Sequence, residues 1–80
     1  MTVRIRLFAS ARDAFGFDTR EITIDTPSLD AVRKFLLDEH PAAEVILRSC
    51  RFAVNMEYSR DDAPVKDGDE VAIIPPVSGG

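Results

Sequence analysis

Segments typical of β-strands lie at both ends of the chain, and one long segment between them has the helical period. Residues 2–7 alternate apolar with polar side chains, and residues 70–74 form a dense apolar run of β-forming type. Apolar residues from Ser28 to His40 recur every three or four positions, which predicts an amphipathic helix that Pro41 ends. Eighty residues allow one compact core, so we expect an α+β fold: a mixed sheet crossed by one main helix.

Two shorter elements are expected between the first strand and this helix. Ser10 is placed to cap a helix of one or two turns, with Asp13 near the reciprocal capping position and Gly16 at its end. Residues 20–24 alternate again, and their closeness to the first strand favours an antiparallel pair.

The second half of the chain is predicted to hold one internal strand. Residues 44–48 fit either a short helix or a strand, and their apolar members are expected to cover one edge of the core: Val45, Ile46 and Leu47. Residues 51–58 alternate as a single strand with three core-facing positions: Phe52, Val54 and Met56. The acidic clusters at 61–62 and 67–69 are typical of turns. The expected order is strand, strand, helix, strand and final strand.

Composition narrows the class of partner. The formal net charge is -4, which argues against nucleic acid or an anionic membrane and favours a basic or mixed protein surface. No segment approaches the length of a transmembrane span, and the N-terminus lacks the apolar stretch of a signal peptide, so a cytoplasmic location is expected. Cys50 is the single cysteine, which excludes an internal disulfide and a multi-thiolate metal site.

The segment after the final strand is the best indication of function. It consists of Pro75, Pro76, Val77, Ser78, Gly79 and Gly80. The prolines lack a donor N–H, so they end the strand and favour a stiff exit, while glycines have no Cβ to obstruct a narrow channel. Such a tail suits insertion into a partner's active site, where the α-carboxylate of Gly80 would react. The alternative is a frayed end without a role.

Three segments closely resemble the small subunits of molybdopterin synthase, the MoaD-type sulfur carriers of the ubiquitin-like family. They are residues 7–13, residues 66–72 and the Pro-Pro-Val-Ser-Gly-Gly segment, and the likeness covers the whole chain. The resemblance implies a β-grasp fold with the first and last strands parallel at the sheet centre. Residues 1–75 would form this domain and residues 76–80 a flexible tail. The chain departs from the family at Ile73 and Ile74, where members often carry aromatic residues.

The resemblance also implies a reaction at the C-terminus. A carboxylate is a poor acyl donor at neutral pH, so ATP, used by an E1-like adenylyltransferase, would first adenylate Gly80. A sulfur nucleophile would then leave a thiocarboxylate, which divides a difficult transfer into easier steps. The acceptor would be cyclic pyranopterin monophosphate in the large subunit, in a heterotetramer that makes molybdopterin for the molybdenum cofactor. The carrier would bind no cofactor, nucleic acid or membrane, and would be no enzyme by itself.

The body of the domain is expected to position the tail. The residues that would enter the partner are Pro76, Val77, Ser78 and Gly79. An apolar patch near Phe8, Ile74 and Val77, with Arg12 at its rim, is expected to dock on the partner. The alternatives are that Phe8 and Ile74 are ordinary core residues and that Arg12 is a solvated helix residue.

Other polar candidates have simpler structural interpretations. Cys50 is interpreted as a small buried hydrophobe and His40 as a helix cap. The aspartate clusters lack the ligand number of a hard-cation site. Three functional alternatives stay open: a sulfur carrier for thiamine or tRNA thiolation, a ubiquitin-like modifier that passes its acyl group to a lysine, and a non-reactive β-grasp interaction domain.

Overall fold

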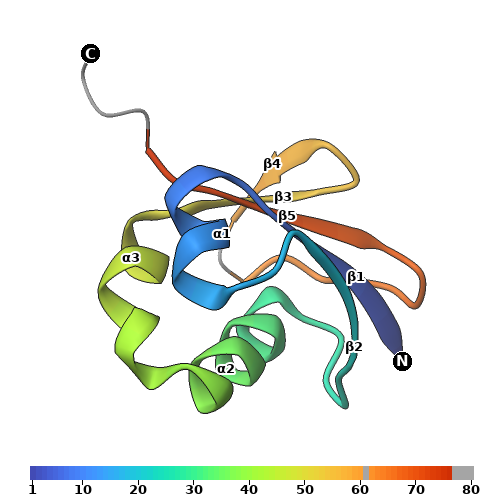
Figure 1. Ribbon diagram of the computed structural model, residues 1–80. Coiled ribbons are helices and arrows are strands. Elements are labelled where there is room, and N and C mark those ends of the chain that lie inside the picture. The colour runs from blue at the N-terminus through green and yellow to red at the C-terminus, as the bar shows by residue number, and fades with distance from the viewer. Residues whose placement is uncertain (61, 77–80) are drawn as a thin grey trace.

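The computed structural model describes residues 1–60 and 62–76. Within them, five strands form one mixed sheet in the order β2-β1-β5-β3-β4 (Figure 1). The strands are β1 (Thr2–Leu7), β2 (Thr19–Thr23), β3 (Arg51–Val54), β4 (Glu57–Ser59) and β5 (Glu70–Ile74). The helices are α1 (Ala9–Phe15), α2 (Leu29–Glu39) and α3 (Glu44–Ser49), with a 3-10 turn η1 (Pro41–Ala43) before α3.

The first and last strands lie side by side and parallel at the centre of the sheet. Ile5 pairs with Val71 and Leu7 with Ile73 in this central ladder. On its other side β1 pairs antiparallel with β2, which begins one residue earlier than the predicted segment 20–24. The predicted mixed sheet with a central parallel pair is therefore confirmed.

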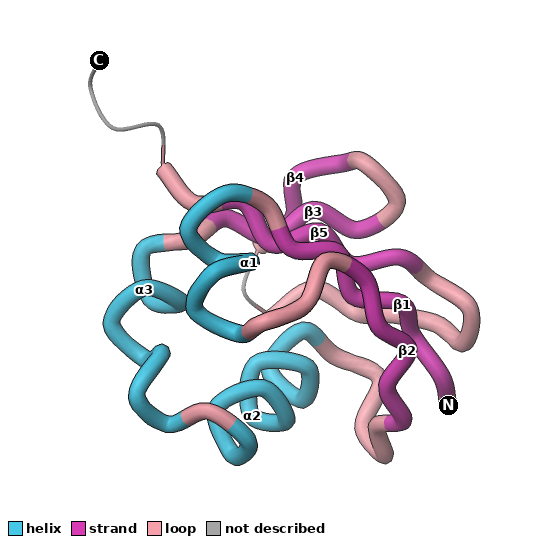
Figure 2. Tube along the Cα trace, in the orientation of Figure 1, coloured by secondary structure: helices cyan, strands magenta, loops and turns pink. Residues whose placement is uncertain are grey.

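The main helix begins and ends where its capping residues predict. The Oγ of Ser28 accepts a hydrogen bond from the backbone N–H of Ala31 at 3.3 Å, and His40 closes the helix directly before Pro41. Its buried residues are Leu29, Val32 and Leu36, so one stripe of α2 packs on the sheet. Figure 2 shows α2 and α3 on the same side of the sheet.

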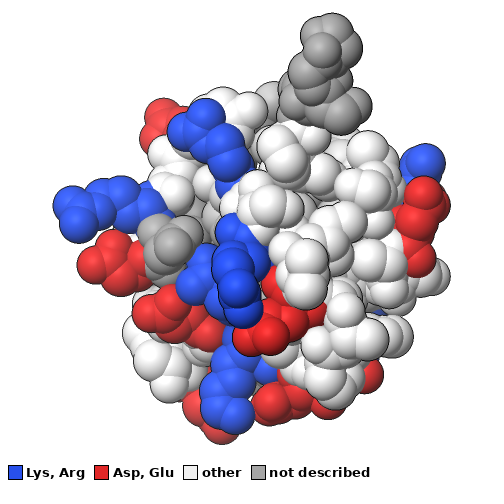
Figure 3. Space-filling model, turned by 90° about the vertical axis from the view of Figure 1, so that its left-hand side faces the viewer, with Lys and Arg blue, Asp and Glu red and all other residues white. Residues whose placement is uncertain are grey.

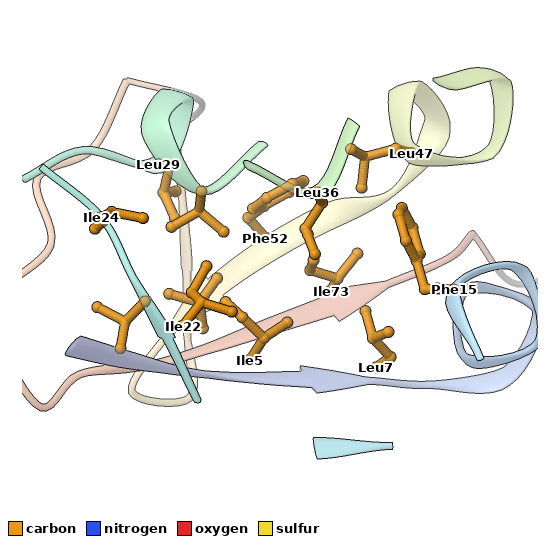
Figure 4. Packing of buried hydrophobic residues seen from close by; sticks show 14 of the residues in the cluster. Ile5, Leu7, Phe15, Ile22, Ile24, Leu29, Leu36, Leu47, Phe52 and Ile73 are labelled. Carbon is orange, nitrogen blue, oxygen red and sulfur yellow. The ribbon is translucent and has the colours of Figure 1, made fainter. Parts of the chain in front are cut away.

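One hydrophobic core fills the space between this sheet face and the helices. Its larger members point toward one another in Figure 4, and they come from both layers: Ile5, Leu7, Phe15, Ile22, Leu36, Leu47, Phe52 and Ile73. Buried core side chains are drawn from positions between Val3 and Ile73. None of the described helices lies over the side chains of the opposite sheet face (Figure 2).

The predicted capping of the short helix is wrong. Helix α1 starts at Ala9, and its N-cap is Phe8, which makes no side-chain cap bond. The chain turns into the helix through Ala9, whose φ is 49°, so Ser10 already lies in the first turn. Asp13 has no reciprocal capping role as a result. The predicted end is confirmed, because Gly16 takes a left-handed conformation with φ 83° and donates its N–H to the carbonyl of Arg12.

The single predicted strand over residues 51–58 is in fact a hairpin of β3 and β4. Asn55 and Met56 form its turn with φ values of 51° and 70°, the positive values that a two-residue hairpin of type I′ requires. Met56 therefore points away from the core and is 90% exposed, which contradicts its predicted core position. The hairpin adds one strand to the expected order.

The ambiguous segment 44–48 is helical, as α3. Leu47 is buried in the core and Ile46 is partly buried against it, but Val45 is 77% exposed. The expectation that all three apolar residues cover the core is therefore wrong for Val45. The cause is the helical period, which turns consecutive residues to different sides.

The predicted turn at 67–69 joins three parts of the sheet. Asp67 Oδ1 accepts the N–H of Thr2 at 2.7 Å. Asp69 accepts from the Asn55 side chain at 2.9 Å and from the N–H of Lys66 at 2.8 Å. Asn55 in turn accepts the N–H of Glu70 at 3.0 Å. These bonds join the start of β1 and the β3–β4 turn to the turn that precedes β5.

Replacing Asp69 with asparagine is expected to remove part of the acid sensitivity of folding. Hydrogen bonds from Asn55 and from the N–H of Lys66 lower the pKa of Asp69 below its ordinary value of 3.8. Because the depressed pKa belongs to the folded state, its stabilisation is present above pH 3.8 and is lost as pH falls through the folded value. We expect wild type to exceed Asp69→Asn by about 1 kcal/mol in unfolding free energy at pH 6, and by less in acid.

The measurement is urea unfolding of both proteins between pH 2 and pH 6 (roughly the range over which carboxylates titrate). Asp13→Asn is the matched control, because Asp13 makes no hydrogen bond or ion pair with the described residues. A constant difference between wild type and Asp69→Asn across this range would contradict the role given to Asp69.

Candidate functional site

The carboxyl ends of β1 and β5 lie at the same edge of the sheet because the two strands are parallel. β1 is followed there by Phe8 and β5 by Pro75 and Pro76 (Figure 1). Pro75 is buried and Pro76 is exposed. The structure therefore places the root of the predicted tail next to the predicted docking residue Phe8. The remaining tail residues, Val77, Ser78, Gly79 and Gly80, lie outside the described residues.

The sheet face that points away from the helices adjoins this edge. The open face consists of the outward positions of the strands, which the ladder pairs place opposite one another: Arg4 with Glu21 and Glu70, Arg6 with Ala72, Ala72 with Ala53, Ala53 with Tyr58, and Ile74 with Arg51. Alternation makes these positions point away from the core. In Figure 2 no helix covers this side of the sheet.

Phe8 and Ile74 both belong to this edge of the open face. Phe8 is 39% exposed, and the guanidinium carbon of Arg6 lies 5.5 Å from the centre of its ring. Ile74 is half-buried. Neither residue belongs to the buried core, so their interpretation as ordinary core residues is wrong. Phe8 ends the extended segment with φ -123° and ψ 148°, directly before the turn at Ala9.

Arg12 lies on α1 and is already paired within the chain. Its Nε is 3.4 Å from Oδ1 of Asp18, and both side chains are largely exposed. An exposed pair of this kind contributes little to stability, about 0 to 1 kcal/mol. Arg12 is therefore a solvated helix residue in this structure, and its rim contact with a partner stays a prediction.

Tyr58 is an exposed aromatic residue of the open face that the sequence analysis missed. It is 59% exposed on β4, and the guanidinium carbon of Arg51 lies 4.1 Å from its ring centre. The hairpin at Asn55 and Met56 brings it opposite Ala53, on a strand that β5 and β3 separate from β1. The available signal was Asn55, since asparagine tolerates the left-handed conformation of such turns.

The other polar candidates, Cys50 and His40, make contacts that hold the fold together. The Sγ of Cys50 donates to the carbonyl of Ile46 at 3.1 Å, and burial raises the pKa of its thiol, which keeps it in the less nucleophilic form. His40 ends α2 and sets its ring edge-on to Phe15 at 5.5 Å. Among residues 1–60 and 62–76, no three His, Cys, Asp or Glu side chains are grouped closely enough to hold a metal ion.

Basic and acidic side chains are interspersed on the surface. On the side of the molecule that Figure 3 shows, Lys and Arg alternate with Asp and Glu, and an uncharged area lies beside them. Salt bridges join oppositely charged residues on the surface of the described part of the chain, as between Glu44 and Arg48 at 3.5 Å. On this face acidic groups lie beside the basic ones, whereas the binding of a nucleic-acid backbone depends on surplus positive charge. Among the described residues, no helix is long and apolar enough to cross a membrane.

Comparisons with known proteins give the same fold and match the chain over most or all of its length. The model of the ThiS family matches residues 5–80. A molybdopterin synthase sulfur carrier subunit from Chlamydomonas reinhardtii is 37% identical over 83 residues, which cover 100% of both chains. The crystal structure of SAMP1 from Haloferax volcanii is 26% identical, with a TM-score of 0.87 and full coverage of both chains.

A solved complex provides a further likeness. A chain in the complex of subunits 1 and 2 of the molybdopterin-converting factor from Helicobacter pylori matches with a TM-score of 0.71 and 28% identity, over 100% of both chains. The sheet with its parallel central strands, the proline pair at the end of β5 and these full-length matches agree with one another. The chain belongs to the ThiS family, in the group of molybdopterin synthase sulfur carrier subunits.

Proposed function

We propose that this protein carries sulfur as a thiocarboxylate on Gly80 and donates it, as the small subunit of molybdopterin synthase, in molybdenum cofactor biosynthesis. One observation supports this most: the proline pair leaves the sheet edge at the end of β5, beside the end of β1 and the exposed Phe8. A tail that starts there has a stiff root and a docking surface next to it. The full-length likeness to sulfur carrier subunits supports the same function.

The chemistry takes place at the α-carboxylate. An E1-like partner uses ATP to form an acyl-adenylate on Gly80, and a sulfur nucleophile displaces AMP to leave the thiocarboxylate. This anion is unhindered, because glycine has no side chain. The carrier needs no general base, metal or bound cofactor in this scheme, since ATP belongs to the activating enzyme. It acts as the sulfur-donating subunit of a complex and not as an enzyme by itself.

Docking of the domain supplies the positioning. We define the docking patch as Phe8, Tyr58 and Ile74, with Arg12 at its rim. Ordering each tail residue in a partner costs about 1 to 2 kcal/mol of backbone entropy, and the prolines reduce this cost beforehand. Burial of the exposed aromatic side chains offsets part of the remainder. Pro76, Val77, Ser78 and Gly79 then lie in the partner's channel, with the large subunit as the partner.

A ubiquitin-like modifier is the second candidate. It is favoured by the TM-score of 0.87 with SAMP1, a type named small archaeal modifier protein. Such a protein would use the same activated Gly80 but form an amide with a lysine of another protein. A carrier for thiamine synthesis or tRNA thiolation would share the thiocarboxylate and differ only in the acceptor.

Mass spectrometry is expected to show the thiocarboxylate directly. After incubation with the activating enzyme, ATP and a sulfur source, the C-terminal peptide should gain the mass of one oxygen-to-sulfur exchange, and other peptides should not. Omission of ATP should abolish the gain, because the carboxylate then keeps its poor leaving group. Addition of the large subunit and cyclic pyranopterin monophosphate should return the peptide to its original mass. Higher-mass conjugates in place of this gain would favour the modifier.

A further inference from the structure

Among the described residues, the strands of the open face carry three arginines and two carboxylates. Arg4 pairs with Glu21 and Arg6 with Glu70, each with an N–O distance of 3.7 Å. The third arginine of this face, Arg51, is exposed and stands opposite Ile74 in the ladder of β3 and β5. Among the described residues no carboxylate lies within ion-pair distance of it, so it is the surplus cation of this face.

The guanidinium of Arg51 is held in place without any acceptor. It lies over the ring of Tyr58, with 4.1 Å between the guanidinium carbon and the ring centre. A cation–π contact of this kind restricts where the guanidinium lies and leaves its N–H groups able to donate to a partner. No side-chain hydrogen bond of Arg51 to the described residues exists. A planar fork of donors is therefore presented to solvent from a position that Tyr58 helps to define.

Arg51 is also next to the root of the tail. Its ladder partner Ile74 is followed directly by Pro75 and Pro76. A partner that admits the tail into its active site must therefore cover the surface around Arg51 and Tyr58. Covering an arginine without giving its charge a partner would cost binding energy, because the desolvated cation would stay unpaired.

We propose that the molybdopterin synthase large subunit presents a carboxylate that binds Arg51, which makes Arg51 a specificity-determining residue beside the docking patch. The proposal rests on the proposed function. An arginine and a carboxylate can form two parallel hydrogen bonds, which adds orientation to attraction. Stacking on Tyr58 supplies this orientation before the partner arrives. The contact therefore selects the rotation at which the domain docks above the tail channel.

The experiment measures the dissociation constant of the complex between the carrier and the large subunit. Arg51→Gln is expected to weaken binding about ten-fold, in line with a charge pair that becomes partly desolvated. Raising the salt concentration should weaken wild-type binding more than Arg51→Gln binding, because the variant lacks the ion pair. Arg51→Lys keeps the charge but loses the fork and the stacking, so it should fall between the two.

Two further variants distinguish the role of Arg51 from the role of the docking patch. Arg4→Gln makes the same chemical change on the same face, at the opposite end of β5, where Arg4 pairs with Glu21 and aligns with Glu70. It should bind like wild type. Phe8→Asp should bind at least as poorly as Arg51→Gln, because it puts a charge into the apolar part of the patch. Thermal unfolding of each variant checks that the exposed substitutions leave the fold intact.

Each outcome decides one point. If Phe8→Asp is weak but Arg51→Gln binds like wild type with the same salt dependence, the docking patch stands and the role of Arg51 is refuted. Equal losses in Arg51→Gln and Arg4→Gln would also refute it, since general charge would then explain binding. A loss with the activating enzyme but not with the large subunit would refute the assigned partner. Failure of wild type to bind would refute the proposed function.

Discussion

Deletion of Gly80, or addition of one alanine after it, is expected to abolish sulfur donation while the domain stays folded. Deletion moves the carboxylate one residue back from the partner's reactive centre, and addition puts a methyl-bearing residue where glycine alone is expected to fit. The fold should be unaffected, because the buried core is drawn from Val3 to Ile73. Sulfur transfer to cyclic pyranopterin monophosphate and the thiocarboxylate mass gain should both fall to background in each variant.

A variant with one alanine added before Met1 is the matched control. It changes chain length by the same amount at the other end of the molecule, since β1 begins there and runs parallel to β5 toward the tail root. Sulfur donation should persist in this control, and thermal unfolding should be the same in all variants. Normal sulfur transfer by the protein without Gly80 would contradict the assignment of that residue as the reactive group.

The elements with a long regular period could be predicted from the sequence. β1, β5 and α2 were found within a residue or two because each repeats its pattern over several residues and has a clear end, such as Ser28 and Pro41. The hairpin was missed because its turn residues, Asn55 and Met56, continue an alternating pattern without glycine. The start of α1 was missed because a left-handed Ala9 takes the place of a capping side chain.

Some features of the candidate site could likewise be predicted from the sequence, and others could not. The reactive tail is a local feature, so composition and order were enough to propose it. Exposure of Phe8 was left open by alternation, since a period of two does not tell which sheet face the helices cover. Arg51 has no carboxylate partner among the described residues because of how three strands pair and because two salt bridges elsewhere on the face use the carboxylates there. No pattern within a single segment carries that information.

Replacing Phe52 with alanine is expected to destabilise the protein by about 3 to 5 kcal/mol, because it removes a large buried side chain and leaves a cavity. Phe52 is 2% exposed, and Figure 4 shows its ring between the sheet and α2. The guanidinium carbon of Arg33 lies 5.0 Å from the ring centre, so this contact is lost too. A domain of this size has a total stability of about 4 to 12 kcal/mol, so the loss is a large share of it and should lower the midpoint of thermal unfolding by more than about 10 °C.

Because of where Phe52 lies, the stability lost in Phe52→Ala also tests whether β3 supports the end of β5, from which the tail leaves. β3 is the strand that supports β5 on the side away from β1, and Phe52 stands opposite Ile73, one residue before Ile74. Urea unfolding measures the free energy of unfolding that is lost. Phe52→Leu is the control. It is expected to cost less than about 1.5 kcal/mol, because leucine keeps most of the apolar volume. If Phe52→Ala lost less than about 1 kcal/mol, the ring would not lie in a tightly packed core. Sulfur donation by Phe52→Ala at low temperature should recover in proportion to its folded fraction, because the ring supports the sheet edge and touches no reacting group.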